Sequence, residues 1–315
     1  MNFHRILAWG FPIILVVSQV ACRPGDKIGG WGAMTPEQMR LEKINHIDSM
    51  TLRTVMNPDS AEGWKQLSTL SADAWVLIDD STGYVISQRY ANEPRFMASL
   101  TKMMTCLLTL ENGNMTDTVY ITDDVFIFKD SRVRLGEGYL VRDLLYEMML
   151  QSDNDAAYAL AKYVGGDTLR FCDMMNEKAA YLGMTSTHFA NPNGMPAPDN
   201  YSTANDLVRL ARYAMRDSTF EEIVGTAGKN VPLIDGRHMV CRNTNILLGT
   251  YDGCFGIKTG YTRQAGNCLA SVATRDGTTL YLVLLNSRSM RSRFTESATL
   301  LDYGFRVMRT YREMK

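Results

Sequence analysis

Stretches typical of β-strands lie near both ends of this chain and enclose a mainly helical middle. Residues 75–89 and 267–285 are rich in β-forming residues, and Arg275-Asp276-Gly277 divides the second stretch into a predicted hairpin. This order predicts an α/β (α+β) protein, in which an antiparallel sheet from both chain ends is flanked by helices and joined to an all-helical lobe. The part from 71 to 315 is long enough for one large core. We expect a site in the cleft between sheet and lobe.

The segment around Ser99 predicts a helix that begins near this serine. Apolar residues follow at helical spacing, and Glu111-Asn112-Gly113 is a fitting C-terminal stop. Because positions three apart share a helix face, the Lys102 amine is expected to approach the Ser99 hydroxyl. The helix start also provides unpaired N–H groups and a partial positive charge where an oxyanion would form.

A serine activated by a lysine needs that lysine to be neutral. An ordinary lysine, with a pKa near 10.4, is neutral in only about one molecule in 2,500 at pH 7. Burial beside a second cation lowers a lysine pKa, so we expect Lys258 to help make Lys102 the base for Ser99. An isolated Ser-x-x-Lys pattern is more often an N-cap followed by a solvated lysine, so this hypothesis depends on two further motifs.

The second motif, Ser152-Asp153-Asn154, reads as a short connection between two helices. Ser152 could pass a proton from Lys102 toward a leaving amine, while Asn154 could hold the Lys102 side chain or a substrate amide. Helix capping by Asp153 or Asn154 explains the same residue types equally well.

The third motif, Lys258-Thr259-Gly260, ends the run Cys254 to Ile257 and precedes the predicted hairpin. It therefore belongs to a strand close to the sheet. Lys258 and Thr259 can pair there with a substrate carboxylate, and Gly260 lets a peptide backbone approach. A simple turn is the alternative for Thr-Gly.

Taken together, the three motifs provide a nucleophile, a base, a proton carrier and a carboxylate clamp. Each pattern occurs once in the chain, in the order and broad separation known for class A β-lactamases and penicillin-binding proteins. This set favours an acyl-transfer enzyme that uses neither a metal nor a histidine.

The chain resembles the serine D-alanyl-D-alanine carboxypeptidases, which are low-molecular-mass penicillin-binding proteins. The resemblance covers about residues 70 to 310 and extends beyond the three motifs to the segments 84–97, 191–196, 201–207, 293–297 and 300–305. It implies a β-lactamase/transpeptidase-like fold and a Ser99 acyl-enzyme that removes the terminal D-alanine from peptidoglycan pentapeptides. Peptidoglycan stem peptides are then the substrates, β-lactams are inhibitors, and no cofactor is needed.

The same resemblance implies roles for residues outside the motifs. The backbone N–H groups of Ser99 and Tyr261 would form an oxyanion hole, and Arg293 would face the carboxylate with Lys258 and Thr259. Class A β-lactamases add a glutamate that activates the deacylating water. Between the second and third motifs this chain has Glu177, Glu221 and Glu222, none in the Glu-x-x-Leu-Asn context of that family. We therefore expect inhibition by β-lactams with little turnover of them.

The N-terminus predicts export. An apolar stretch over residues 6–17 follows His4-Arg5, and it is short for a membrane span but right for a signal peptide core. Ala21 before Cys22 indicates lipoprotein processing of a 1–22 signal peptide, with Cys22 lipidated, although Gln19 departs from the usual aliphatic residue. Plain cleavage nearby or an uncleaved anchor are the alternatives. Residues 23–70 read as a tether and N-terminal segment.

Composition excludes several other functions. The net charge of -1 makes nucleic acid and acidic membranes poor partners. There is no Cys-x-x-Cys, and the four histidines are too few for a zinc site, so metal catalysis is not expected. Since little chain follows Phe305, we expect any membrane attachment to come from the N-terminus.

Two alternatives to the carboxypeptidase function remain. One is a D,D-endopeptidase acting on cross-links, and the other is a non-catalytic lipoprotein that binds wall peptides or β-lactams.

Overall fold

The computed structural model describes residues 67–313 except 129 and 235. The predicted signal peptide, Cys22 and most of the 23–70 segment lie outside the described residues. None of the described helices combines the length and the apolar character that crossing a bilayer requires.

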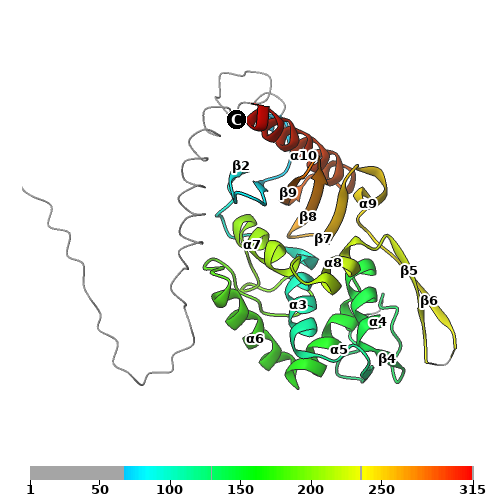
Figure 1. Ribbon diagram of the computed structural model, residues 1–315. Helices are drawn as coiled ribbons and strands as arrows, with labels where there is room; N and C mark the ends of the chain where they lie inside the picture. Colours follow the sequence, from blue (N-terminus) through cyan, green and yellow to red (C-terminus); the bar gives the residue numbers. More distant parts are fainter. Residues whose placement is uncertain (1–66, 129, 235, 314–315) are drawn as a thin grey trace, which may run out of the picture. The chain divides into compact units, whose positions relative to one another are not determined.

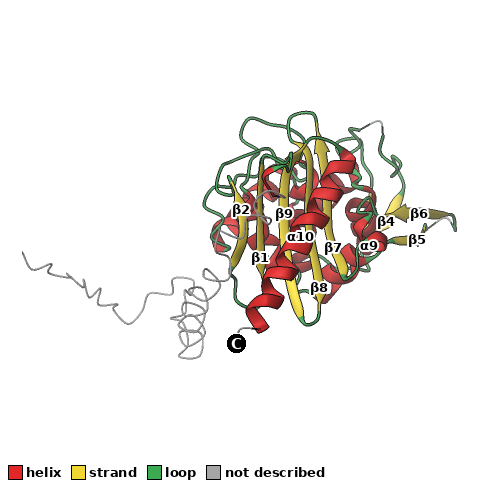
Figure 2. Cartoon of the chain, turned by 90° about the horizontal axis from the view of Figure 1, so that it is seen from above, coloured by secondary structure: helices red, strands yellow, loops and turns green. Residues whose placement is uncertain are grey.

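The main sheet has five antiparallel strands in the order β2-β1-β9-β8-β7 (Figures 1 and 2). The strands are β1 (Ala74–Asp79), β2 (Val85–Arg89), β7 (Cys254–Thr262), β8 (Gly266–Arg275) and β9 (Thr278–Ser287). The hairpin between β8 and β9 turns at Asp276 and Gly277, both with positive φ. The sheet thus pairs β1 with β9, which joins the two predicted β-rich stretches and confirms the prediction.

Helix α10 (Met290–Glu313) crosses one face of the sheet (Figure 2). Its buried leucines, Leu300 and Leu301, pack with Leu77 and Leu282 of the sheet in one apolar cluster. At Gly304 an added Cβ would lie 2.8 Å from the Leu77 side chain and 2.7 Å from that of Leu280. The absence of a side chain at this position therefore lets the helix lie close on the strands.

The opposite face carries the helical lobe, whose axis is the buried helix α3 (Figure 1). The helices of this part are α3 (Lys102–Asn112), α4 (Val141–Tyr146), α5 (Asn154–Gly165), α6 (Thr168–Tyr181), α7 (Ala204–Ala214) and α8 (Ser218–Gly225). A short helix α9 (Leu247–Thr250) precedes β7. Two small antiparallel sheets pair β3 (Thr118–Tyr120) with β4 (Gly138–Leu140) and β5 (Gly228–Pro232) with β6 (His238–Arg242). The predicted fold class is confirmed.

Candidate active site

Ser99 lies on a 3-10 turn, η1 (Ala98–Thr101), that leads directly into α3. The turn rests on the loop around Gly194, where an added Cβ would lie 1.9 Å from the Ala98 carbonyl oxygen; the positive φ of 88° also suits glycine. Ser99 is half-buried and therefore open to a substrate. The predicted helix start at the serine, and the helix stop at Gly113, are confirmed.

Lys102 is fully buried one turn beyond Ser99, and three oxygens surround its amine. Nζ lies 3.2 Å from Ser99 Oγ, 2.8 Å from Asn154 Oδ1 and 2.8 Å from the Asn193 carbonyl oxygen, and in its charged form it donates to all three. A neutral amine has two N–H donors and one lone pair. Since the amide and the carbonyl can only accept, they take both N–H groups, and the lone pair is directed at the Ser99 hydroxyl.

Burial lowers the pKa of Lys102 from 10.5 to about 7, against the opposing effects of Asp153 and Asp130. About half of the molecules then have a neutral amine at pH 7. The expected lowering by burial is confirmed, whereas Lys258 is not among the groups that shift this pKa. The pKa of Lys258 is also lowered, first by burial and then by the neighbouring cations Lys102 and Arg293.

The Ser152-Asp153-Asn154 motif connects the π-helical turn η2 (Glu147–Gln151) to α5. Asp153 is the N-cap of α5, accepting from the Ala156 N–H at 3.0 Å, so the capping alternative describes this residue. Asn154 instead faces Lys102, as predicted for the amide. Ser152 is half-buried in the left-handed conformation, with φ 67°. No hydrogen bond between described residues joins its hydroxyl to Ser99 or Lys102.

Lys258, Thr259 and Gly260 lie on β7, which is an edge strand of the sheet beside η1. An added Cβ at Gly260 would come within 3.0 Å of the Ser99 backbone nitrogen, so the strand and the serine turn are in close contact. Lys258 is buried, and its Nζ donates to the Thr259 carbonyl at 3.3 Å. The third motif is thus on a strand, as predicted, and not in a turn.

Arg293 contacts the end of this strand, and Tyr261 belongs to it. Arg293, on α10, is buried, and its Nη1 donates to the carbonyls of Gly260 at 3.0 Å and Cys268 at 3.4 Å. Its side chain is therefore bound to the backbone of β7 and β8. The Tyr261 side chain is 64% exposed at the rim.

Two contributions escaped the residue-by-residue reading of the sequence. Asn193 binds Lys102 through its backbone carbonyl, which carries no residue-type signal, although the 191–196 loop was part of the family resemblance. Thr244 lies 2.6 Å from Thr259, hydroxyl to hydroxyl, and nothing in its local pattern marks it.

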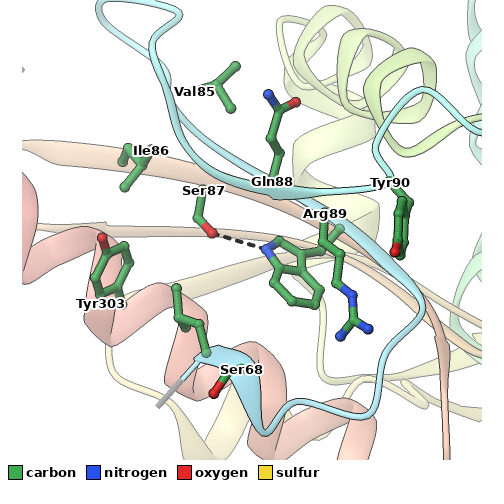
Figure 3. A pocket seen from close by; sticks show the side chains of 10 residues that line it. Ser68, Val85, Ile86, Ser87, Gln88, Arg89, Tyr90 and Tyr303 are labelled. Atoms are coloured by element: carbon green, nitrogen blue, oxygen red, sulfur yellow. Dashed lines mark hydrogen bonds between the residues drawn. The ribbon is translucent and has the colours of Figure 1, made fainter. Parts of the chain in front are cut away.

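A cavity of about 640 Å³ lies elsewhere in the described part of the chain. It lies against β2, and its lining includes Trp75, Ile86, Arg89 and Tyr303. Ser87 Oγ accepts a hydrogen bond from the Trp75 indole in the wall of this cavity (Figure 3). None of the predicted site residues lines it.

In the described part of the chain no group of three or more His, Cys, Asp or Glu side chains could hold a metal. The cysteines of this part form no disulfide bond; they are Cys106, Cys172, Cys241, Cys254 and Cys268.

A half-exposed serine, a buried amine whose lone pair is directed at it, and a cationic edge strand form an arrangement suited to acyl transfer to serine. A sequence model of the D-alanyl-D-alanine carboxypeptidases matches residues 60–289. The chain belongs to this family.

Individual relatives agree with this assignment. The chain is 34% identical over 256 residues to a D-alanyl-D-alanine carboxypeptidase of Streptomyces sp. strain K15, covering 75% of this chain and 88% of the relative. It is 34% identical over 241 residues to the carboxypeptidase DacB2 of Mycobacterium tuberculosis, covering 74% and 82%. The crystal structure of the Streptomyces K15 DD-transpeptidase superposes with a TM-score of 0.71 at 33% identity, over 75% of this chain and 98% of that one.

Proposed function

We propose that this protein is a serine D,D-carboxypeptidase that removes the terminal D-alanine from peptidoglycan pentapeptides through a Ser99 acyl-enzyme. One observation carries the proposal. The fully buried Lys102 amine, with a pKa of about 7, lies 3.2 Å from the Ser99 hydroxyl and is held by two acceptors that leave its lone pair for the serine proton.

In the acylation step, Ser99 Oγ attacks the carbonyl carbon of the peptide bond before the terminal D-alanine, and Lys102 takes the hydroxyl proton. The developing oxyanion accepts from the backbone N–H groups of Ser99 and Tyr261, and the close contact of Gly260, the residue before Tyr261, with the Ser99 nitrogen supports this role. The carbon–nitrogen bond then breaks. The proton passes from Lys102 by way of Ser152 to the departing amine, and D-alanine leaves.

The free edge of β7 accounts for how a peptide would be held. An extended peptide can add to an edge strand through main-chain hydrogen bonds, with side-chain sites giving selectivity. The terminal carboxylate would then face Lys258 and Thr259. Burial and the cations Lys102 and Arg293 lower the pKa of Lys258. A carboxylate bound beside this amine raises its pKa again and favours the charged form.

Arg293 supports this end of the site from behind. Because its guanidinium binds the carbonyls of Gly260 and Cys268, it fixes the end of β7 and adds positive potential to the carboxylate subsite. Asn154 holds Lys102 in place.

Deacylation by water completes the cycle on the peptide and is slow on a penicilloyl ester. The glutamates between the second and third motifs have other positions. Glu177 pairs with Arg170 on α6, Glu222 accepts from the Tyr146 hydroxyl, and Glu221 is exposed on α8. We therefore expect β-lactams to acylate Ser99 and to remain bound for long periods.

We further propose that residues 71–315 form the catalytic domain, that 1–22 is a lipoprotein signal peptide, and that Cys22 carries a lipid that anchors the protein in the cell envelope through the 23–70 tether. Expression with a radiolabelled fatty acid tests the anchor. Label on the parent and none on Cys22→Ser is the expected result, and an unlabelled parent would remove this part of the proposal.

Intact-mass spectrometry after incubation with benzylpenicillin tests the function. The parent protein should gain the mass of one penicilloyl group and Ser99→Ala should gain none. Release of D-alanine from a pentapeptide then assigns the reaction, whereas cleavage only of cross-linked dimers would indicate an endopeptidase. If the parent forms no adduct, the acyl-enzyme proposal fails.

A further inference from the structure

Thr244 joins two motifs of the site that are far apart in the sequence. It lies on the segment between β6 and α9. Its backbone N–H donates to the Leu150 carbonyl at 3.1 Å, just before the Ser152 motif, and its Oγ1 lies 2.6 Å from Thr259 Oγ1 on β7. Thr244 is exposed while Thr259 is buried, so the pair reaches from the solvent side of the site to the Lys258-Thr259-Gly260 strand.

The backbone around Thr244 is fixed by its neighbours and not by its hydroxyl. Asn243 Nδ2 donates to the Val224 and Thr226 carbonyls at 3.3 and 3.0 Å, and Asn245 Nδ2 donates to the Gly256 carbonyl at 3.0 Å. The Thr244 hydroxyl makes no other hydrogen bond among the described residues. Its contact with Thr259 is therefore available for a role other than holding the fold.

The number of hydroxyl protons limits how Thr244 and Thr259 can bind each other and a ligand. Each hydroxyl has one proton and can also accept, and only one of the two can donate across the pair. If Thr259 donates to Thr244, it has no proton left for a ligand. If Thr244 donates to Thr259, the Thr259 proton is free. A carboxylate can only accept hydrogen bonds, so a carboxylate that faces Thr259 requires the second arrangement.

We propose that Thr244 is a positioning residue whose hydroxyl donates to Thr259 Oγ1, so that the Thr259 hydroxyl donates to the terminal carboxylate of the substrate. This inference rests on the proposed carboxypeptidase function and adds a residue to its specificity for a free C-terminus. Thr244 acts through Thr259 and strengthens binding of the carboxylate before any bond changes, so its loss weakens substrate binding more than it slows the chemistry.

The test compares Thr244→Val, which keeps the shape and removes the hydroxyl, with Thr244→Ser, which restores it. Thr250→Val is the matched control, because Thr250 is an exposed threonine on α9 whose hydroxyl donates to the Ile246 carbonyl. The substrates are a peptide ending in D-alanyl-D-alanine and the same peptide with its terminal carboxylate converted to an amide.

For Thr244→Val we expect KM for the acid peptide to rise about fivefold to tenfold, with kcat within about twofold of the parent. Thr244→Ser should return KM to within about twofold of the parent, and Thr250→Val should leave it unchanged. On the amide peptide, the parent and Thr244→Val should have the same kcat/KM. Unchanged KM on the acid peptide, an equal loss on both peptides, or no rescue by serine would each overturn the inference.

These outcomes are separable from failure of the function itself. If the parent acquires no penicilloyl group at Ser99, the function has failed. If the parent is acylated and the threonine variants do not discriminate acid from amide, only the role of Thr244 has failed. Thermal unfolding of each variant identifies a general loss of folding, and the serine variant and the amide peptide still decide the question in that case.

Discussion

The rate at which penicillin acylates Ser99 should rise with pH through about 7, because the base must be neutral to accept the serine proton. Burial lowers the pKa of Lys102 from 10.5 to about 7, so raising the pH from 5 converts the protonated, inactive amine to the neutral, active one. Because only the neutral amine accepts the serine proton, the rate of acylation falls below pH 7 and is retained above it.

The magnitude follows from the neutral fraction of the amine. With a pKa of about 7, roughly 1% of the molecules are neutral at pH 5, half at pH 7 and about 90% at pH 8. The acylation rate should therefore increase about 90-fold between pH 5 and pH 8 and then level off. A lysine with an ordinary pKa would instead give a rate that continues to increase about tenfold per pH unit up to pH 10.

Stopped-flow measurement with a fluorescent penicillin gives this rate directly, and circular dichroism at each pH shows that the fold is kept. Lys102→Met should slow acylation by roughly 10²- to 10⁴-fold and remove the pH dependence. A rate that is flat from pH 5 to 9, or one that is still rising above pH 9, would refute the argument that burial prepares Lys102 as the base.

Glu147 is the control for this experiment. Burial also raises the pKa of its carboxyl to about 7, and its Oε2 accepts from the Cys241 thiol at 2.8 Å. Its titration could produce a similar inflection. In Glu147→Gln the rise in acylation rate near pH 7 should persist. If the rise disappears in this variant, the pH dependence is due to Glu147 and not to Lys102.

Three substitutions test the packing around the serine. Gly260→Ala places a Cβ 3.0 Å from the Ser99 backbone nitrogen and should slow acylation at least about tenfold, measured with the same fluorescent penicillin. Gly194→Ala drives a Cβ into the Ala98 carbonyl at a positive φ and should destabilise the fold by about 2 kcal/mol or more in urea unfolding. Arg293→Met frees the Gly260 carbonyl and should raise KM for the acid peptide more than it lowers kcat. Unchanged behaviour in any of these would contradict the corresponding contact.

Local patterns in the sequence were enough to predict the elements that carry the site. The apolar series after Ser99 predicted α3 and its end at Gly113, and the turn at residues 275–277 predicted the β8–β9 hairpin. Both depend on side-chain periodicity and turn chemistry over a few residues, so no distant contact is needed to predict them. The spacing of Ser99 and Lys102 was enough, for the same reason, to place the amine beside the hydroxyl.

Contacts between distant segments had to come from the tertiary structure. Asn154 and Asn193 reach Lys102 from 52 and 91 residues away, and the second does so through a backbone carbonyl that any residue could supply. For the same reason, the sequence could not show that Arg293 binds the backbone of β7, or that Thr244 meets Thr259.

The lowered pKa of Lys102 separates what the sequence determines from what the tertiary structure decides. The sequence by itself determined which residue types stand in which order: a serine with a lysine one turn away, a polar motif between helices, and a cationic strand. Only the packing of the helical lobe against the sheet decided that Lys102 is fully buried. Desolvation depends on everything that surrounds a group in space, so it lowers this pKa in a way that no local pattern encodes.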